Sequence, residues 1–227
     1  MLASGINILF EGQNMARLMS GLAVTIKIAL VAVVLSLIFG VIFGIIMTSK
    51  NLIVKAVCRL YLEAIRIIPI LVWLFLFYFG LTRAMGIHLE GEFISIVVFT
   101  MWGTAEMGDI VRGAVTSMPR HQTESGLSLG LTKLQIYRYI LVPQTVRRVL
   151  PGAINLATRM VKTTSLVVII GVVEVLKVGQ QIIEGGILNT PAAPLWVYGF
   201  IFFLYFILCY PISIVAKRLE QSGNVRS

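Results

Sequence analysis

The sequence predicts an all-α, polytopic membrane protein built as a helical bundle of about five transmembrane helices. Of its 227 residues, 58% are hydrophobic, and the mean hydropathy is +0.93. Soluble domains are less apolar than this, so lipid is the expected solvent for most of the chain. The net charge of +9 does not indicate a nucleic-acid-binding protein, because the charges fall mostly between apolar runs.

Five apolar segments approach the length of about 20 helical residues that the hydrocarbon core of a bilayer requires. We expect a single transmembrane domain, residues 1–227, with spans at 21–48, 56–80, 93–111, 152–175 and 195–216. The first span is too long for a signal-peptide core and no cleavage pattern follows it, so we expect it to be retained. Cys58 and Cys209 lie far apart in the sequence and indicate neither a disulfide nor a metal site.

The distribution of lysine and arginine predicts the orientation, because cytoplasmic loops collect positive charge. Three basic residues would face outward: Arg17, Arg83 and Lys177. With five spans and the N-terminus outside, a much larger set faces the cytoplasm: Lys50, Lys55, Arg59, Arg112, Arg120, Lys133, Arg138, Arg147, Arg148, Lys217, Arg218 and Arg226. We therefore expect the C-terminus, and the loop between the third and fourth spans, to be cytoplasmic.

That loop, residues 117–143, is too polar for lipid, and its pattern predicts two short helices. Ser117 is placed to cap the start of the first helix. Gly130 suits a left-handed cap at its end. Thr132 followed by Gln135 has the spacing of a capping box, which opens the second helix.

Two further features of the loop bear on its use. Val142 precedes Pro143 and is disfavoured in the α region, so we expect the second helix to end there. Ser125 and Gly126 would leave a bare patch that another backbone or protein surface can approach closely. The loop is therefore either an ordinary solvated connection or a docking element for a soluble partner.

The loop resembles the Glu-Ala-Ala signature of the integral membrane subunits of bacterial ABC importers. In that signature a Gly follows after three residues, and an apolar residue and a Pro close the segment. Here it reads Glu124-Ser125-Gly126, then Gly130 and later Pro143. Four further segments resemble motifs of the polar amino acid permease branch, in family order: YLEAIRIIP (61–69), GDIVRG (108–113), KTTSL (162–166) and IGVVE (170–174).

The resemblance implies the transmembrane-domain fold of a type I ABC importer in a bacterial inner membrane. It implies three protein partners: a cytoplasmic ABC ATPase dimer, a second permease subunit (the same or a related chain), and an extracytoplasmic amino-acid-binding protein. ATP and Mg²⁺ would bind to the ATPase, so this chain would carry no cofactor, no catalytic residue and no metal. Its cargo would cross by alternating access. The implied ATPase-coupling residues are Glu124, Ser125, Gly126 and Gly130.

Polar residues within spans are costly in lipid and usually face an interior path or a partner. The candidate residues of the substrate path are Glu63, Pro69, Trp73, Thr104, Glu106, Thr163, Thr164 and Ser165. The candidates for structural ion pairs are Arg66, Asp109, Arg112, Arg159 and Lys162.

Several of these residues have a structural alternative. Glu63 and Arg66 are three apart and could satisfy each other. Asp109 could pair with Arg112 in the same way. The hydroxyl groups of 163–165 could bond back to their own helix instead of lining a path.

Two departures from the family pattern bear on the cargo. Thr163 stands where the family has an acidic residue, and Trp73 stands where it frequently has glutamine. Losing the acidic residue argues against a cationic amino acid, so we favour a neutral or acidic polar amino acid such as glutamine or glutamate. Glu106 stands where the family usually has tyrosine, and the sequence offers no account of it.

Three other functions remain open alternatives. The chain could serve an ABC importer of another small solute, such as a cationic amino acid, cystine, methionine, phosphate or an opine. An ion channel or pore would need a repeated polar stripe and no ATPase. An embedded enzyme is disfavoured, because the sequence contains no HExxH, GxSxG or P-loop pattern.

Overall fold

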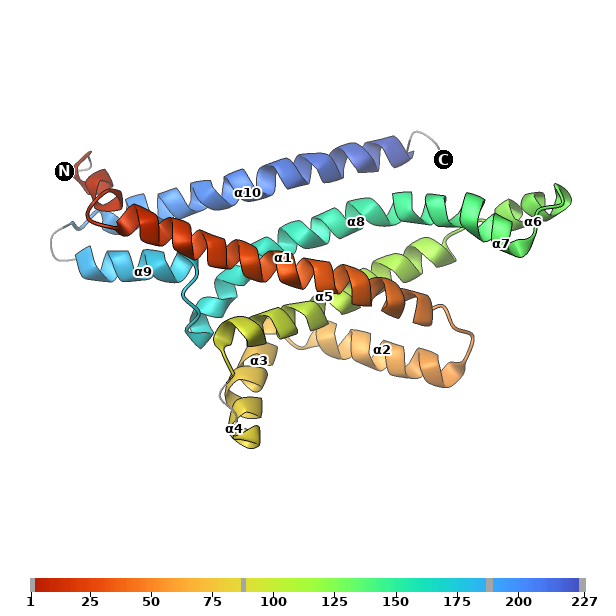
Figure 1. Ribbon diagram of the computed structural model, residues 1–227, viewed down its shortest axis with the longest axis horizontal. Helices are drawn as coiled ribbons and strands as arrows, with labels where there is room; N and C mark the ends of the chain where they lie inside the picture. Colours follow the sequence, from red (N-terminus) through yellow and green to blue (C-terminus); the bar gives the residue numbers. More distant parts are fainter. Residues whose placement is uncertain (1–2, 87–88, 187–189, 225–227) are drawn as a thin grey trace. The chain divides into compact units, whose positions relative to one another are not determined.

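The computed structural model describes residues 3–86, 89–186 and 190–224, and every regular element in these ranges is helical (Figure 1). The longer helices are α1 (Asn14–Ile46), α2 (Leu52–Ile67), α5 (Gly91–Thr116), α8 (Val142–Thr163), α9 (Val175–Gly186) and α10 (Ala193–Asn224). The shorter α-helical segments are α3 (Ile70–Phe75), α4 (Thr82–Met85), α6 (Arg120–Ser128) and α7 (Lys133–Ile136). The 3₁₀-helices are η1 (Ala3–Leu9) and η4 (Thr164–Ile170), and the π-helical turns are η2 (Leu76–Leu81) and η3 (Tyr137–Leu141). Arg226, one of the predicted cytoplasmic charges, lies outside the described residues.

Four helical stretches are long and apolar enough to cross a membrane: Asn14–Ile46, Gly91–Thr116, Lys133–Ile170 and Ala193–Leu219. A fifth crossing results if the broken pair Leu52–Ile67 and Ile70–Ala84 is counted as one span. The prediction of an all-α protein with about five membrane helices is therefore confirmed.

Two prolines that follow an apolar residue have opposite effects on their helices. Before Pro69, Ile68 adopts an extended conformation (φ −81°, ψ 123°) and α2 ends. Before Pro143, Val142 stays helical (φ −61°, ψ −48°) and donates its N–H to the Tyr137 carbonyl across the π turn. The prediction that the helix ends at Val142 is therefore wrong. A π turn is wider than an α turn, so it gives the proline ring room that an α turn would deny it.

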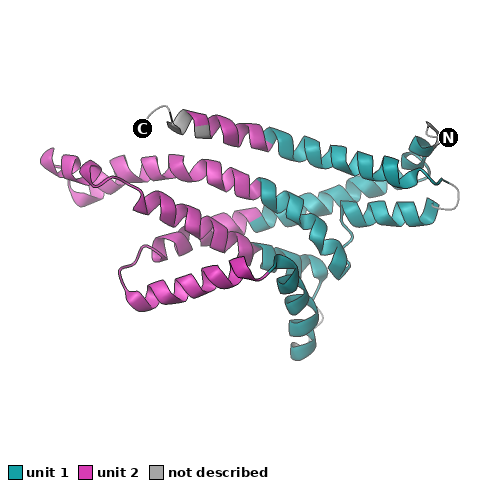
Figure 2. Ribbon diagram, turned by 180° about the vertical axis from the view of Figure 1, so that it is seen from behind, with its two compact units in different colours: residues 1–32, 69–99, 158–211 teal, residues 33–68, 100–157, 212–227 magenta. Residues whose placement is uncertain are grey.

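The described chain divides into two compact units, shown in teal and magenta in Figure 2. Unit 1 comprises residues 1–32, 69–99 and 158–211. In its core, η1 and α1 pack against α9 and α10, and the buried side chains include Ile8, Leu18, Val175, Val178, Ile182, Val197 and Ile201. Gly21 allows close contact in this core, because a Cβ atom there would lie 2.9 Å from the Val175 backbone.

Unit 2 comprises residues 33–68, 100–157 and 212–227. Its core joins α5 and α8 through Met107, Val111 and Leu156, and the partly buried Leu37 of α1 packs against them. Gly44 of α1 faces α5 so closely that a Cβ atom there would lie 2.7 Å from the Gly108 carbonyl oxygen. Within lipid, small residues of this kind let helix backbones approach and gain dispersion contacts, since hydrophobic burial drives association only weakly.

Gly44→Ala should destabilise the protein, because the added methyl group would meet both the Gly108 oxygen and the Val111 side chain. The expected cost is about 1–3 kcal/mol, seen as a lower midpoint of thermal unfolding in detergent. Gly199→Ala on α10 is the matched control, because its added Cβ would have no neighbour within 4 Å. Equal midpoints for the two variants would contradict the close α1–α5 contact.

Candidate functional site

The α6–α7 hairpin joins α5 to α8 within unit 2 and occupies the predicted loop 117–143 (Figure 1). Pro119, in an extended conformation, precedes the first turn of α6, so the prediction of Ser117 as the N-cap is wrong. Ser117 is engaged by α8 instead. Arg148 donates from Nη1 to the Ser117 hydroxyl oxygen at 3.0 Å and to its carbonyl oxygen at 3.2 Å. This contact fixes the entry of the hairpin to α8.

The turn between α6 and α7 follows the predicted local pattern. Gly130 has φ +75°, in the left-handed region, and its N–H donates to the Leu127 carbonyl at 2.9 Å. The Thr132 N–H donates to Gln135 Oε1 at 2.8 Å, and the Gln135 N–H donates to Thr132 Oγ1 at 3.3 Å. The predicted left-handed cap and capping box are confirmed. Both devices satisfy backbone groups at helix ends and so make the turn well defined.

Gly126 is the packing centre of the hairpin. It is buried on the inner side of α6, and a Cβ atom there would lie 2.8 Å from Ile136 Cγ1 and 3.4 Å from Ile140 Cδ1. The predicted bare patch therefore exists only at Ser125, which is exposed, because side chains of the same hairpin cover Gly126. Gly126 is small because two helices of the same hairpin touch there.

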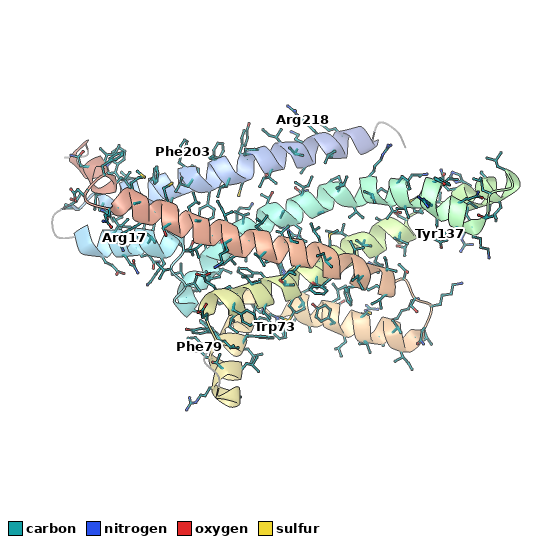
Figure 3. All side chains as sticks on the ribbon, viewed as in Figure 1. Arg17, Trp73, Phe79, Tyr137, Phe203 and Arg218 are labelled. Atoms are coloured by element: carbon teal, nitrogen blue, oxygen red, sulfur yellow. The ribbon has the colours of Figure 1, made fainter. Side chains whose placement is uncertain are left out.

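The hairpin exposes several apolar side chains although the segment is otherwise polar. Leu129 is 79% exposed, Leu134 76% and Tyr137 59%, and Figure 3 labels Tyr137. Glu124 is exposed on the same hairpin. We call Glu124, Ser125, Leu129, Leu134 and Tyr137 the hairpin face. Exposed apolar groups rimmed by polar ones are typical of a protein-binding surface.

A second cluster in unit 2 links α2 to α5 by ion pairs. Arg66 Nη2 lies 2.7 Å from Asp109 Oδ2, and Arg66 Nε lies 3.2 Å from Glu106 Oε1. Arg112 Nη2 lies 2.6 Å from the other Asp109 oxygen, so the predicted Asp109–Arg112 pair is confirmed. The alternative that Glu63 and Arg66 satisfy each other is wrong, because the Arg66 fork reaches across to two carboxylates on α5. Glu63 instead approaches Arg59 at 3.9 Å.

The remaining predicted path residues lie on separate elements, and their role in transport stays a prediction. In unit 2, Thr104 is half-buried on α5. In unit 1, Pro69 begins the segment after the break, and Trp73 of α3 buries its Nε1 with no acceptor among the described residues. Arg159 and Lys162 are exposed on the last turns of α8.

The three neighbouring hydroxyl groups bond back to their own helix. Thr163 donates to the Arg159 carbonyl at 2.8 Å, and Thr164 donates to the Val161 carbonyl at 2.7 Å. Ser165 donates to the carbonyl of residue 162 at 2.9 Å. These three hydroxyl groups therefore bond back to their own helix, which was the structural alternative to lining a path. Their lone pairs still leave them able to accept hydrogen bonds.

Sequence reasoning missed the buried carboxylate of Glu174, which it treated only as the end of the IGVVE segment. Glu174 is 0% exposed and caps the start of α9, accepting the N–H groups of Leu176 at 2.9 Å and Lys177 at 3.1 Å. Its other oxygen accepts from the Thr25 hydroxyl at 3.1 Å and the Tyr205 hydroxyl at 3.4 Å. The signal in the sequence was an acidic residue directly before an amphipathic helix.

No metal centre emerges from this geometry. Within the described ranges, no group of three or more His, Cys, Asp or Glu side chains is placed to hold a metal ion. The binding of ATP and Mg²⁺ by a partner subunit stays a prediction.

Apolar helices of membrane-spanning length, joined by a structured polar hairpin with an exposed apolar face, define a multi-pass membrane protein. Its class can be specified further by comparison. A family model described as "Binding-protein-dependent transport system inner membrane component" matches residues 36–222, and the chain belongs to this family.

Curated relatives of similar length support the assignment. The chain is 35% identical over 170 residues to the glutamine transport system permease protein GlnP of Escherichia coli K12, covering 74% of this chain and 75% of that protein. It is 30% identical over 212 residues to the probable glutamine ABC transporter permease protein GlnP of Bacillus subtilis, covering 93% and 95%. The octopine transport system permease protein OccM of Rhizobium meliloti is 25% identical over 184 residues, covering 78% and 75%.

Solved structures show the same fold. A crystal structure of an amino acid ABC transporter with histidines matches with a TM-score of 0.81 at 25% identity, covering 92% of this chain and 95% of that one. An inward-facing structure of the MetNI methionine ABC transporter matches with a TM-score of 0.68 at 18% identity, covering 92% and 97%. The predicted fold of a type I ABC importer membrane domain is confirmed.

Gly126→Ala should loosen the hairpin, because its Cβ would displace Ile136. The expected result is faster trypsin cleavage within the hairpin, after Arg120, Lys133 or Arg138, under native conditions. Adding Ile136→Ala removes the clashing atoms, so the double variant should be cleaved more slowly than the sum of the single effects predicts. Gly113→Ala, with no neighbour within 4 Å of its added Cβ, is the control. Additive effects at Gly126 and Ile136 would show that the two residues do not touch.

The Arg66–Asp109 pair should appear as an interaction energy in a double-mutant cycle built from Arg66→Gln and Asp109→Asn. We expect a coupling of about 1 kcal/mol in thermal unfolding, reduced by the partial exposure of Arg66. The control cycle of Arg59→Gln and Glu63→Gln should give nearly zero, because those atoms are 3.9 Å apart and Arg59 is 82% exposed. Equal couplings in the two cycles would contradict a bracing role for Arg66.

Proposed function

We propose that this chain is the membrane-spanning subunit of an ATP-driven importer that moves a polar L-amino acid into the cytoplasm, with glutamine as the leading candidate. The hairpin face carries the proposal. A cytoplasmic loop that exposes Leu129, Leu134 and Tyr137 needs a protein partner, and family membership points to the ATPase of the same importer. The energy source would lie in that partner, since this sequence has no P-loop.

The construction of the hairpin suits the transmission of force. Gly126 locks α6 against α7, the capping box fixes the turn, and Arg148 ties the entry to α8. The helix that leaves the hairpin runs without a break from Lys133 to Ile170. Movement of a docked ATPase would therefore be passed to a membrane helix with little loss in the hairpin.

The proposed assembly has three kinds of component. Two permease subunits, identical or related, would enclose the path, because about five spans leave no closed passage. An ATPase dimer would grip the two hairpins from the cytoplasm, and a binding protein would deliver the amino acid on the outer side. This requires the N-terminus outside and the C-terminus in the cytoplasm, as the positive charges indicate.

The preference for glutamine as the cargo rests on the relatives of this chain and on two of its residues. Relatives named for glutamine transport reach 30–35% identity, whereas the octopine relative is at 25%. Thr163 offers a hydroxyl where a carboxylate would attract a cationic side chain. Trp73 has a buried indole N–H with no acceptor in the part of the chain that the structure describes, and such a donor suits a carbonyl or carboxylate oxygen. An importer of a cationic amino acid, cystine or an opine is the alternative.

Leu129→Glu should uncouple the importer, because a charge in the centre of an apolar contact leaves an unpaired buried group. We expect ATP-dependent uptake of L-glutamine into proteoliposomes with the complete importer to fall at least about tenfold, with loss of the ATPase on purification. Leu52→Glu, whose side chain is equally exposed at 80% but lies at the start of α2, is the matched control.

Three outcomes separate the proposal from its rivals. Normal uptake and normal ATPase retention by Leu129→Glu would rule out the hairpin face as the docking surface. Uptake that needs neither ATP nor a binding protein would favour a channel. Uptake of L-arginine but not of L-glutamine by the complete importer would shift the cargo to a cationic amino acid.

A further inference from the structure

An apolar stripe on η3 and the first half of α8 lies outside the hairpin face. Its exposed side chains are Tyr139 (66%), Val142 (51%), Val146 (49%) and Leu150 (40%), and we call them the η3–α8 stripe. Val142, Val146 and Leu150 are four residues apart, so they lie on one side of the helix. The stripe follows the helical stretch that leaves α7 in Figure 1.

The opposite side of this helix contacts the hairpin. Gln144 donates from Nε2 to Gln122 Oε1 at 3.3 Å, and Arg148 donates to the Ser117 hydroxyl oxygen at 3.0 Å. Residues two positions apart in an α-helix are separated by about 200°, and residues 144 and 148 stand two positions from the stripe residue 146. The stripe therefore points away from the hairpin, on a side of the helix that the chain itself leaves exposed.

Contacts within unit 2 show where its helices leave the hydrocarbon core. Gly44 of α1 lies beside Gly108 of α5, and an added Cβ at Gly152 of α8 would lie 3.1 Å from Ile110 Cγ2 of α5. The three helices therefore share one level. Just beyond it, α1 ends and the chain becomes polar at Lys50, and at it α5 carries the charged cluster described above. The hydrocarbon core thus ends close to Gly152, on the side that is cytoplasmic in the proposed function.

Much of the stripe stands outside lipid. The stretch Lys133–Ile170 has 38 residues, and its part from Gly152 onward is about 28 Å long, enough to cross a core of about 30 Å. Counted back from Gly152, Val142 lies about 15 Å and Tyr139 about 20 Å beyond the core. The head-group layer adds only about 5–8 Å on each side. Lipid therefore cannot cover these two side chains.

Positive charge borders the stripe. From residue 133 to residue 150, the sequence has four basic residues and neither Asp nor Glu. Arg138 directly precedes Tyr139 and Arg147 directly follows Val146, so each lies about 100° around the helix from a stripe residue. Both arginines are exposed, and among the described residues neither forms an ion pair with a carboxylate. The edges of the stripe therefore suit a partner that supplies negative charge.

These features select one kind of partner. Exposed apolar side chains outside lipid favour a protein, and basic edges favour a surface that carries Asp and Glu. A second copy of the same stripe would instead bring like charges together. Tyr137 of the hairpin face is two residues from Tyr139, so a protein that holds the hairpin face is already beside the stripe.

We propose that the η3–α8 stripe is a second docking surface for the ATPase, an inference that rests on the proposed function. The ATPase covers the stripe with an apolar groove, and carboxylates at the rim of that groove pair with Arg138 and Arg147. Contact along the stripe stops the helix from pivoting about the hairpin alone. Movement of the ATPase is then passed to α8 as well as to the α6–α7 hairpin.

The first arm of the test removes charge at the edges of the stripe. The complete importer is purified in detergent through a tag on the permease, and the ATPase that stays bound is measured as NaCl is raised. Arg138→Gln with Arg147→Gln should release half of the ATPase at an NaCl concentration at least about threefold lower than the wild type requires. Lys50→Gln with Lys55→Gln is the matched control, because it removes two exposed positive charges near the start of α2 and should behave like the wild type.

The second arm changes the apolar part of the stripe. Val146→Glu should lower retention of the ATPase at low salt about tenfold or more, because the new charge enters an apolar contact bordered by carboxylates. Leu52→Glu, at an 80% exposed residue at the start of α2, should retain the ATPase. A photoreactive benzoylphenylalanine in place of Val146 should crosslink to the ATPase in the otherwise unchanged importer.

Equal salt dependence of the arginine and lysine variants, or normal retention by Val146→Glu, would refute the second docking surface. A crosslink from position 146 to another permease chain, or to lipid alone, would refute it too and identify what covers the stripe. Failure of the proposed function looks different, because the wild type would then retain no ATPase and transport no amino acid. A wild type that transports normally, with the ATPase lost from Leu129→Glu but kept by Val146→Glu, removes the stripe alone and leaves the hairpin face.

Discussion

The structure depends on one constraint: a backbone within lipid must satisfy its N–H and C=O groups internally. Every regular element in the described ranges is accordingly helical. The deviations are local and keep most bonds, as in the π turn Tyr137–Leu141 and the 3₁₀ turn Thr164–Ile170. Helices that bury their own polar groups can then pack through small residues, and Gly44 against α5 is the tightest example that meets backbone.

The polar α6–α7 hairpin is stabilised differently from the membrane helices. Outside the lipid, short helices are marginal unless capped and packed, so α6 and α7 rely on their turn and on a shared apolar contact. Gly126 and Ile136 supply that contact, and Gly130 with the Thr132–Gln135 box supplies the turn. The exposed side chains of Leu129, Leu134 and Tyr137 take no part in this contact or in the turn. In the proposed function, a partner protein covers them.

Signals that reside in neighbouring residues were readable from the sequence, and those that depend on distant residues were not. Apolar runs predicted the membrane helices, and Gly130, Thr132 and Gln135 predicted the glycine cap and the capping box of one turn. The course of the chain at Pro143 depended on a wide turn that no propensity indicates. Gly126 leaves room for Ile136, which lies ten residues away, and Arg66 pairs with two carboxylates on another helix. The ion pair of Lys27 with Glu92 joins residues 65 positions apart and could only be found in three dimensions.

The buried carboxylate of Glu174 restricts how unit 1 can rearrange. Its donors come from α1, from the first turn of α9 and from α10, and all converge on two oxygen atoms. Pulling any one of these helices aside would strand a carboxylate in a dry interior, at a cost of several kcal/mol. The three helices consequently shift as a block or not at all, and the moving parts of any transport cycle must be sought among the segments that Glu174 does not hold.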